Sequence, residues 1–151
     1  MRMLIVTALF TAAGVAAAAP EPYDETADSK AEIRTAQSEA QHTKVPVLVV
    51  FGANWCADCR ILDTTFKSGP SAALISKRFR VVKVDVGKFD RNLDIAEAYG
   101  VPLKKGIPAV AVLSDQGKVL YATRAGELAD ARRMGEKGIH DFFVKVAAPA
   151  K

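Results

Sequence analysis

The fold of this chain is determined by residues 45–60, which read Val-Pro-Val-Leu-Val-Val-Phe-Gly-Ala-Asn-Trp-Cys-Ala-Asp-Cys-Arg. Residues 45–51 are apolar and rich in β-branched side chains, and their number suits a buried strand. Beyond the two cysteines, apolar residues recur at helical spacing at Ile61, Leu62 and Phe66. The pattern predicts a strand, a turn and a helix, with Cys56 at or near the helix N-terminus and Cys59 one turn further in.

This placement of the cysteines favours thiol–disulfide chemistry. A helix N-terminus presents unpaired N–H groups and partial positive charge, which stabilise a thiolate. The two-residue spacing lets the second thiol close a small, reversible disulfide ring with the first. A closed zinc site needs four ligands, and the chain offers two cysteines and two histidines that are distant from them, so such a site is poorly supported. Arg60 stands where a haem attachment motif needs histidine. Neither a metal nor another cofactor is expected.

Two segments resemble thioredoxins. Residues 51–59 resemble the strand-to-active-site segment of that family, including the tryptophan directly before the first cysteine. The segment Gly-Ile-Pro-Ala at 106–109 resembles the family's Gly-Ile-Pro-Thr. The chain is therefore identified as a member of the thioredoxin-like superfamily over about residues 44–146. It is similar to exported bacterial members, including the C-terminal domain of the transmembrane thiol:disulfide interchange reductant. The resemblance implies an α/β fold, with a central mixed sheet (βαβ, then ββα) flanked by helices.

The resemblance also implies roles for individual residues. Cys56 would be the catalytic nucleophile that forms a mixed disulfide, and Cys59 would resolve it. Pro108 would be cis, and together with Ile107 and Trp55 it would bind the substrate chain. From the residues alone, Pro108 could equally be a proline that starts a strand, and Trp55 could equally be core packing.

The chain departs from the family at one position beneath the cysteines. Thioredoxins carry a buried acid six residues before the first cysteine, and Val50 stands there. Lys83 matches the lysine partner of that acid and is, by the same resemblance, a modulating residue of the site. Without the acid it is expected to point to solvent. Water, bulk base or another carboxylate, such as Asp58 or Asp85, would then take the Cys59 proton. Asp58 is also a modulating residue, because its negative charge opposes a thiolate on Cys56.

The remaining elements follow from periodicity. Strands are expected at 80–86, 109–113 and 118–123. Helices are expected at 29–42 and 91–99, and a third begins near Pro70 and buries Ala72, Ile75 and Phe79. A last helix carries Ile139, Phe142, Phe143 and Val146 on one face. Ser29 and Glu32 have the spacing of a capping box. The helix 91–99 is expected to turn Leu93, Ala96 and Tyr99 inward.

The N-terminus predicts export. Residues 1–19 have a short basic start, an apolar stretch and small residues before Pro20, as a cleaved secretory signal has. A retained membrane anchor is the alternative. The expected organisation is a signal peptide at 1–19, a flexible lead-in at 20–28, a thioredoxin-like domain at 29–147 and a tail at 148–151. The protein is expected in the periplasm or secreted, with no membrane span after signal cleavage.

The sequence thus predicts an exported thiol–disulfide oxidoreductase that reduces protein disulfides. Its partners would be protein thiols or disulfides and an upstream redox partner, and a monomer is expected. The net charge of +4, without a basic stripe, argues against nucleic acid as a partner. A non-catalytic binding module and a disulfide donor or isomerase are the alternatives. The basic pair Lys104 and Lys105 is either a solvated surface feature or a determinant of partner choice.

Overall fold

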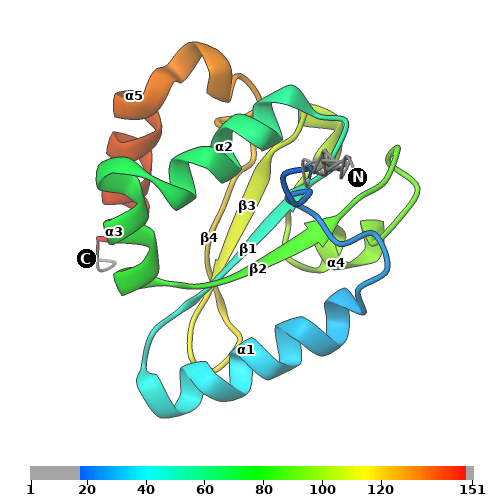
Figure 1. The fold of residues 1–151 in the computed structure, drawn as a ribbon. Coiled ribbons are helices and arrows are strands. Elements are labelled where there is room, and N and C mark those ends of the chain that lie inside the picture. The colour runs from blue at the N-terminus through cyan, green and yellow to red at the C-terminus, as the bar shows by residue number, and fades with distance from the viewer. Residues whose placement is uncertain (1–17, 149–151) are drawn as a thin grey trace, which may run out of the picture.

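A four-stranded mixed sheet forms the centre of the structure, a computed structural model that describes residues 18–148 (Figure 1). The strands are β1 (Val47–Gly52), β2 (Arg80–Asp85), β3 (Ala109–Leu113) and β4 (Val119–Ala122), in the order β2-β1-β3-β4. β1 pairs in parallel with β2 and antiparallel with β3, and β3 pairs antiparallel with β4. The predicted mixed sheet is confirmed.

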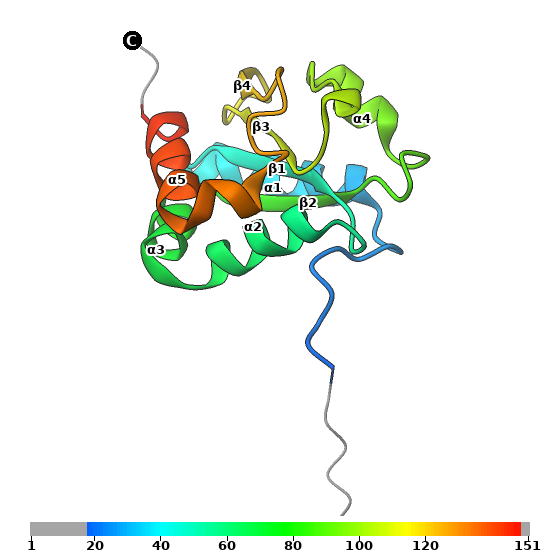
Figure 2. The same ribbon diagram turned by 90° about the horizontal axis from the view of Figure 1, so that it is seen from above.

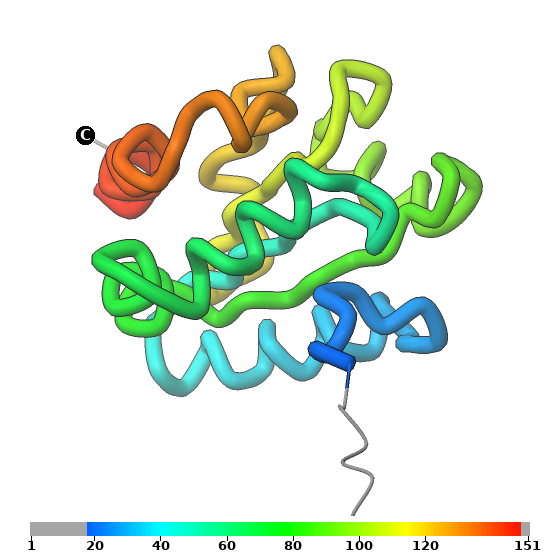
Figure 3. The backbone as a smooth tube through the Cα atoms, turned by 45° about the horizontal axis from the view of Figure 1, so that its top comes forward, coloured from blue at the N-terminus to red at the C-terminus, as the bar shows by residue number. Residues whose placement is uncertain are grey.

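Helices cover both faces of the sheet (Figure 3). One face carries α1 (Ser29–Thr43) and α4 (Leu93–Ala98), and the other carries α2 (Ala57–Lys67), α3 (Gly69–Arg78) and α5 (Ala131–Val146). A short 3-10 helix, η1 (Leu103–Lys105), follows α4. The view from above in Figure 2 shows α2, α3 and α5 lying next to one another.

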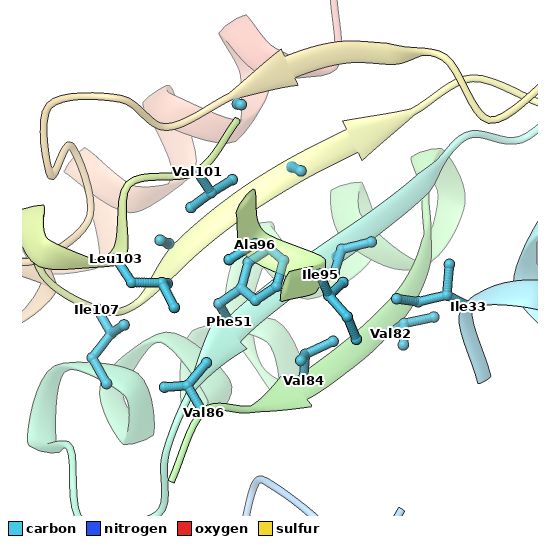
Figure 4. Packing of buried hydrophobic residues seen from close by; sticks show 14 of the residues in the cluster. Ile33, Phe51, Val82, Val84, Val86, Ile95, Ala96, Val101, Leu103 and Ile107 are labelled. Carbon is cyan, nitrogen blue, oxygen red and sulfur yellow. The ribbon is translucent and has the colours of Figure 1, made fainter. Parts of the chain in front are cut away.

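The side chains of β1 alternate between two hydrophobic clusters, as those of a central strand must. Val47, Val49 and Phe51 belong to the cluster under α1 and α4, while Leu48 and Val50 belong to the cluster under α2, α3 and α5. Figure 4 shows the first cluster, with Phe51 beside residues of β2 and α4. Each fully buried side chain of this size contributes about 1.5–3 kcal/mol. This burial on both faces holds the end of β1, where the cysteine motif begins.

Two local predictions were wrong. The N-cap of α1 is Asp28, whose Oδ1 accepts a hydrogen bond from the N–H of Ala31 at 3.0 Å, whereas Ser29 is buried. Leu93 is 43% exposed instead of facing the core. α4 begins at Leu93, two residues later than expected, and it buries Ile95 in place of Leu93. Ala96 is buried, as predicted.

The predicted signal peptide lies almost entirely outside the described residues, which begin at 18. Within residues 18–148, no helix combines the length and the apolar character needed to cross a bilayer.

Candidate active site

The two cysteines lie where β1 leads into α2. Cys56 is the N-cap of α2, and its Sγ accepts a hydrogen bond from the N–H of Cys59 at 3.2 Å. The two residues form a disulfide, with their Cα atoms 5.2 Å apart. Cys56 is 6% exposed and Cys59 is fully buried. The predicted helix start is confirmed, and Cys56 is the more accessible sulfur of the two.

The loop before β3 reaches the same sulfur. The carbonyl oxygen of Ile107 lies 3.7 Å from Cys56 Sγ, and the peptide bond between Ile107 and Pro108 is cis. Because β3 pairs with β1, the segment just before β3 lies beside the segment just after β1. The structure therefore brings together Cys56, Ile107 and Pro108, which are about fifty residues apart in the sequence.

Trp55 is an exposed residue and not part of the core. Its side chain is 54% exposed, and its Nε1 donates a hydrogen bond to the carbonyl of Gly87 at 2.8 Å. The ring packs edge-on against Phe89, with 6.0 Å between centroids. Phe89 is itself 41% exposed. The sequence analysis did not single out Phe89, which completes an exposed aromatic pair next to Cys56.

The Asp58 side chain forms hydrogen bonds and an ion pair with Arg132, at the start of α5. Its Oδ1 accepts hydrogen bonds from the backbone N–H of Arg132 at 2.9 Å and from Nε of the same residue at 3.1 Å. An opposite charge this close offsets much of the effect that Asp58 has on the neighbouring sulfurs. Arg132 lies 74 residues from Asp58, and no local pattern in the sequence indicates the pairing.

Lys83 does not point to solvent, and that prediction was wrong. Its ammonium group forms an ion pair with Asp63, which is buried on α2. Asp63 forms a second ion pair with Lys67, whose Nζ lies 2.6 Å from Asp63 Oδ2. Val50 and Lys83 are neighbours in the β1–β2 register, so both side chains face α2. Burial lowers the pKa of Lys83. The carboxylate that pairs with this lysine therefore comes from the helix, because the strand offers only valine.

Asp63 could have been found from the sequence. It stands four residues after Cys59, and residues four apart lie on one face of a helix. The sequence analysis named Asp58 and Asp85 as carboxylates near Cys59 and passed over this one.

Tyr23, in the segment expected as a flexible lead-in, packs beneath the cysteine motif. Its N–H donates to Asn54 Oδ1 and its carbonyl accepts from Asn54 Nδ2, both at 2.9 Å. The side chain is 3% exposed. Burial and, to a smaller extent, the negative charge of Asp85 raise the pKa of Tyr23. No pattern in the sequence indicated this contact.

Asp85 is the second buried carboxylate of the region. Its Oδ2 lies 3.2 Å from an Arg91 nitrogen, while Oδ1 is buried and has no hydrogen-bond partner among the described residues. Within residues 18–148, histidine, cysteine and acidic side chains do not gather in groups of three or more that could hold a metal ion.

This fold and site define a thiol–disulfide oxidoreductase: a helix start holds one sulfur accessible and the other buried, so that the pair can exchange with a disulfide or dithiol brought to it. Residues 28–114 match the family described as thioredoxin-like. The chain belongs to that family.

Individual relatives agree with this assignment. The chain is 51% identical to a disulphide isomerase from Xylella fastidiosa Temecula1, whose crystal structure it matches with a TM-score of 0.83 over 87% of this chain and 100% of that one. It is 32% identical to Thioredoxin 1 of Synechococcus elongatus over 85 residues, which are 56% of this chain and 72% of the relative. The reduced C-terminal domain of Neisseria meningitidis DsbD shares the fold at 18% identity, with a TM-score of 0.53 over 77% of this chain and 95% of that domain.

Proposed function

We propose that this oxidoreductase is exported and reduces disulfide bonds in other proteins, with Cys56 as the attacking sulfur and Cys59 as the sulfur that completes the reaction. The observation that carries the proposal is the difference between the two sulfurs. Cys56 caps α2 beside Ile107 and next to the exposed Trp55, whereas Cys59 is fully buried behind it. The apolar N-terminal stretch supports export.

The reaction has two exchange steps. The Cys56 thiolate attacks one sulfur of the substrate disulfide, a mixed disulfide forms, and the other substrate sulfur leaves as a thiolate. The Cys59 thiol loses its proton and its thiolate attacks Cys56 Sγ. The second substrate thiolate leaves, and both substrate thiolates take protons from water. The substrate gains two electrons and the enzyme becomes a disulfide, so an upstream redox protein must reduce the pair again.

The substrate chain would bind beside Ile107 and Pro108, where a strand-like peptide can pair with the backbone. An open groove of about 910 Å³ lies next to this loop. Its apolar lining includes Phe89, Pro102 and Leu103. Lys104 and Arg124 bring two positive charges to the groove and Glu97 one negative charge. Such a groove suits apolar residues near the substrate cysteine.

The first experiment is a redox titration of the protein. Trp55 is the single tryptophan and adjoins Cys56, so its fluorescence is expected to report the state of the pair. We expect one reversible two-electron transition in graded dithiol/disulfide buffers, with a strongly reducing midpoint. The absence of any reversible transition would contradict the proposal and favour a non-catalytic binding module.

A disulfide isomerase or donor is the second candidate function. It is favoured by the likeness to the Xylella fastidiosa protein, which is called a disulphide isomerase. The same titration separates the two candidates, since a midpoint near the oxidising end would indicate a donor or isomerase. A midpoint difference of about 30 mV corresponds to roughly 1.4 kcal/mol for two electrons.

Charge reversal at the groove tests whether it selects partners. Lys104→Glu combined with Lys105→Glu is expected to slow reaction with an acidic peptide disulfide about tenfold at low salt, because the attraction becomes repulsion. The redox midpoint is expected to stay the same. The rate constants are measured by stopped flow at low and high salt.

The matched control for this prediction is Lys77→Glu combined with Lys118→Glu. These lysines are exposed and lie at the opposite end of the sheet. Equal rates for the two double variants would show that the basic pair is only a solvated surface feature.

A further inference from the structure

We infer that Tyr23 is a positioning residue for Cys59: its hydroxyl donates a hydrogen bond to the Cys59 sulfur once the disulfide is open, and so stabilises the thiolate that completes the reaction. The inference rests on the proposed roles of the two cysteines. Such a hydrogen bond would assist Cys59 in a chain that has Val50 at the position where thioredoxins carry a buried acid.

The geometry around Gly52 carries the inference. A side chain at Gly52 would overlap the hydroxyl group of Tyr23, and its Cβ would lie 3.0 Å from Cys59 Sγ. The phenol therefore fills the space that glycine leaves at the end of β1, and its hydroxyl oxygen and the Cys59 sulfur both lie within 3.0 Å of the position that such a Cβ would take. Gly52 is the last residue of a fully buried strand, and both the Tyr23 phenol and the Cys59 sulfur leave no room there for a side chain.

Tyr23 is held firmly in this place. The two hydrogen bonds with Asn54 fix its backbone to the turn between β1 and α2, and Figure 2 shows the N-terminal segment running past that turn. The carbonyl of Glu25, two residues on, accepts a hydrogen bond from Arg91 at 3.0 Å. Tyr23 lies outside the residues that match the thioredoxin-like family, which begin at 28. This contact is thus an addition to the part of the chain that matches the family.

Toward a disulfide sulfur or a thiolate, neither of which carries a proton, the hydroxyl can act only as a donor. Because the phenol is buried near Asp85, it keeps its proton throughout the working range of pH. A sulfur in a disulfide is a weak acceptor, whereas a thiolate carries a full charge and accepts strongly. The hydrogen bond therefore stabilises the protein most in its reduced form, after Cys59 has lost its proton.

Other charged groups near Cys59 are already paired within residues 18–148. The pairs are Asp58 with Arg132, Asp63 with Lys83 and Lys67, and Asp85 with Arg91 through Oδ2 alone, since Asp85 Oδ1 has no hydrogen-bond partner among these residues. Each carboxylate has a cationic partner, which reduces its effect on the sulfur. Tyr23 differs from all of them, since it is neutral and its hydroxyl borders the same space at Gly52 as the Cys59 sulfur.

The test is Tyr23→Phe in the full chain, which removes the hydroxyl and keeps the ring. The reduced protein is mixed with a chromogenic aromatic disulfide in a stopped-flow instrument. The first aromatic thiolate is released when Cys56 attacks, and the second when Cys59 attacks. A hydrogen bond to a charged group has an effect of tenfold or more on an equilibrium. We therefore expect the acid dissociation constant of the Cys59 thiol to fall about tenfold.

The pH profile of the second phase should accordingly move to higher pH by about 1. The second phase at neutral pH should slow only about threefold, because a more basic thiolate is also a better nucleophile. The first phase should be unchanged. Tyr99→Phe, which removes a half-buried hydroxyl at the end of α4, is the matched control and should leave both phases unchanged.

A pH profile of Tyr23→Phe that coincides with those of the unaltered chain and of Tyr99→Phe would overturn the inference. A second measurement does not depend on turnover. In the Cys56→Ser chain, ultraviolet absorbance follows ionisation of Cys59 directly, with and without Tyr23→Phe, and an unchanged titration would also overturn it. A chain that fails the redox titration but shows this shift would contradict the proposed function and still support the role of Tyr23.

Discussion

Replacing Cys59 with serine is expected to stop the reaction at the mixed disulfide between Cys56 and the substrate. The buried Cys59 sulfur is the group that would release the substrate, so turnover should fall by about three orders of magnitude or more. The first exchange should still occur, because Cys56 keeps its position at the start of α2. A peptide disulfide incubated with reduced Cys59→Ser should therefore give a covalent adduct, visible by mass spectrometry and reversed by dithiothreitol.

Cys56→Ser is the matched control for the trapping experiment. It removes the more accessible sulfur and leaves the buried one, so it should lose turnover without accumulating an adduct. The opposite pattern, with an adduct on Cys56→Ser and none on Cys59→Ser, would reverse the proposed roles. Full turnover by either variant would refute the two-cysteine reaction.

Asp63→Asn is expected to lower the free energy of unfolding by about 2 kcal/mol. The substitution leaves the half-buried ammonium group of Lys83 without its carboxylate, and a buried charge without a partner is costly. The loss should be smaller than for a fully buried pair, because the Lys83 side chain is 24% exposed. Denaturant unfolding of the unaltered and substituted proteins, under the same redox conditions, measures the difference.

Asp141→Asn is the control for this prediction. Asp141 pairs with Lys137 one turn away on α5 at 2.5 Å, as Asp63 pairs with Lys67 on α2, but both partners are exposed. It should leave the stability essentially unchanged. Lys83→Met added to Asp63→Asn should restore much of the loss, because it removes the unpaired charge. Equal stability of the Asp63 and Asp141 variants would show that burial of Asp63 contributes nothing.

The parts of the site that depend on local sequence were predictable. A β-branched run, a glycine and two cysteines two residues apart are enough to place Cys56 at the start of a helix. The cis peptide before Pro108 was expected only because residues 106–109 resemble a thioredoxin segment. Leu93 was misplaced because helix ends are poorly defined by periodicity alone.

Contacts between distant segments were not predictable in the same way. Lys83 was assigned to solvent because its expected partner was missing at Val50, and the replacement on α2 comes from a different element. Tyr23 precedes every recognisable motif, and only the folded chain shows that Gly52 makes room for it. Asp58 meets Arg132 only because α5 packs against α2.

Because Cys56 caps α2, the redox potential of the cysteine pair depends on the stability of the folded chain. Reduction followed by unfolding, and unfolding followed by reduction, connect the same two states and have the same total free energy. A sulfur that caps a helix only in the folded chain therefore makes folding stability depend on whether the two sulfurs are bonded. The difference in the free energy of unfolding between the reduced and oxidised forms equals the difference in potential between folded and unfolded protein multiplied by twice the Faraday constant. A substitution that stabilises the start of α2 more in the reduced protein than in the oxidised protein raises the two-electron potential. It therefore makes the protein a stronger oxidant, even if it contacts neither sulfur.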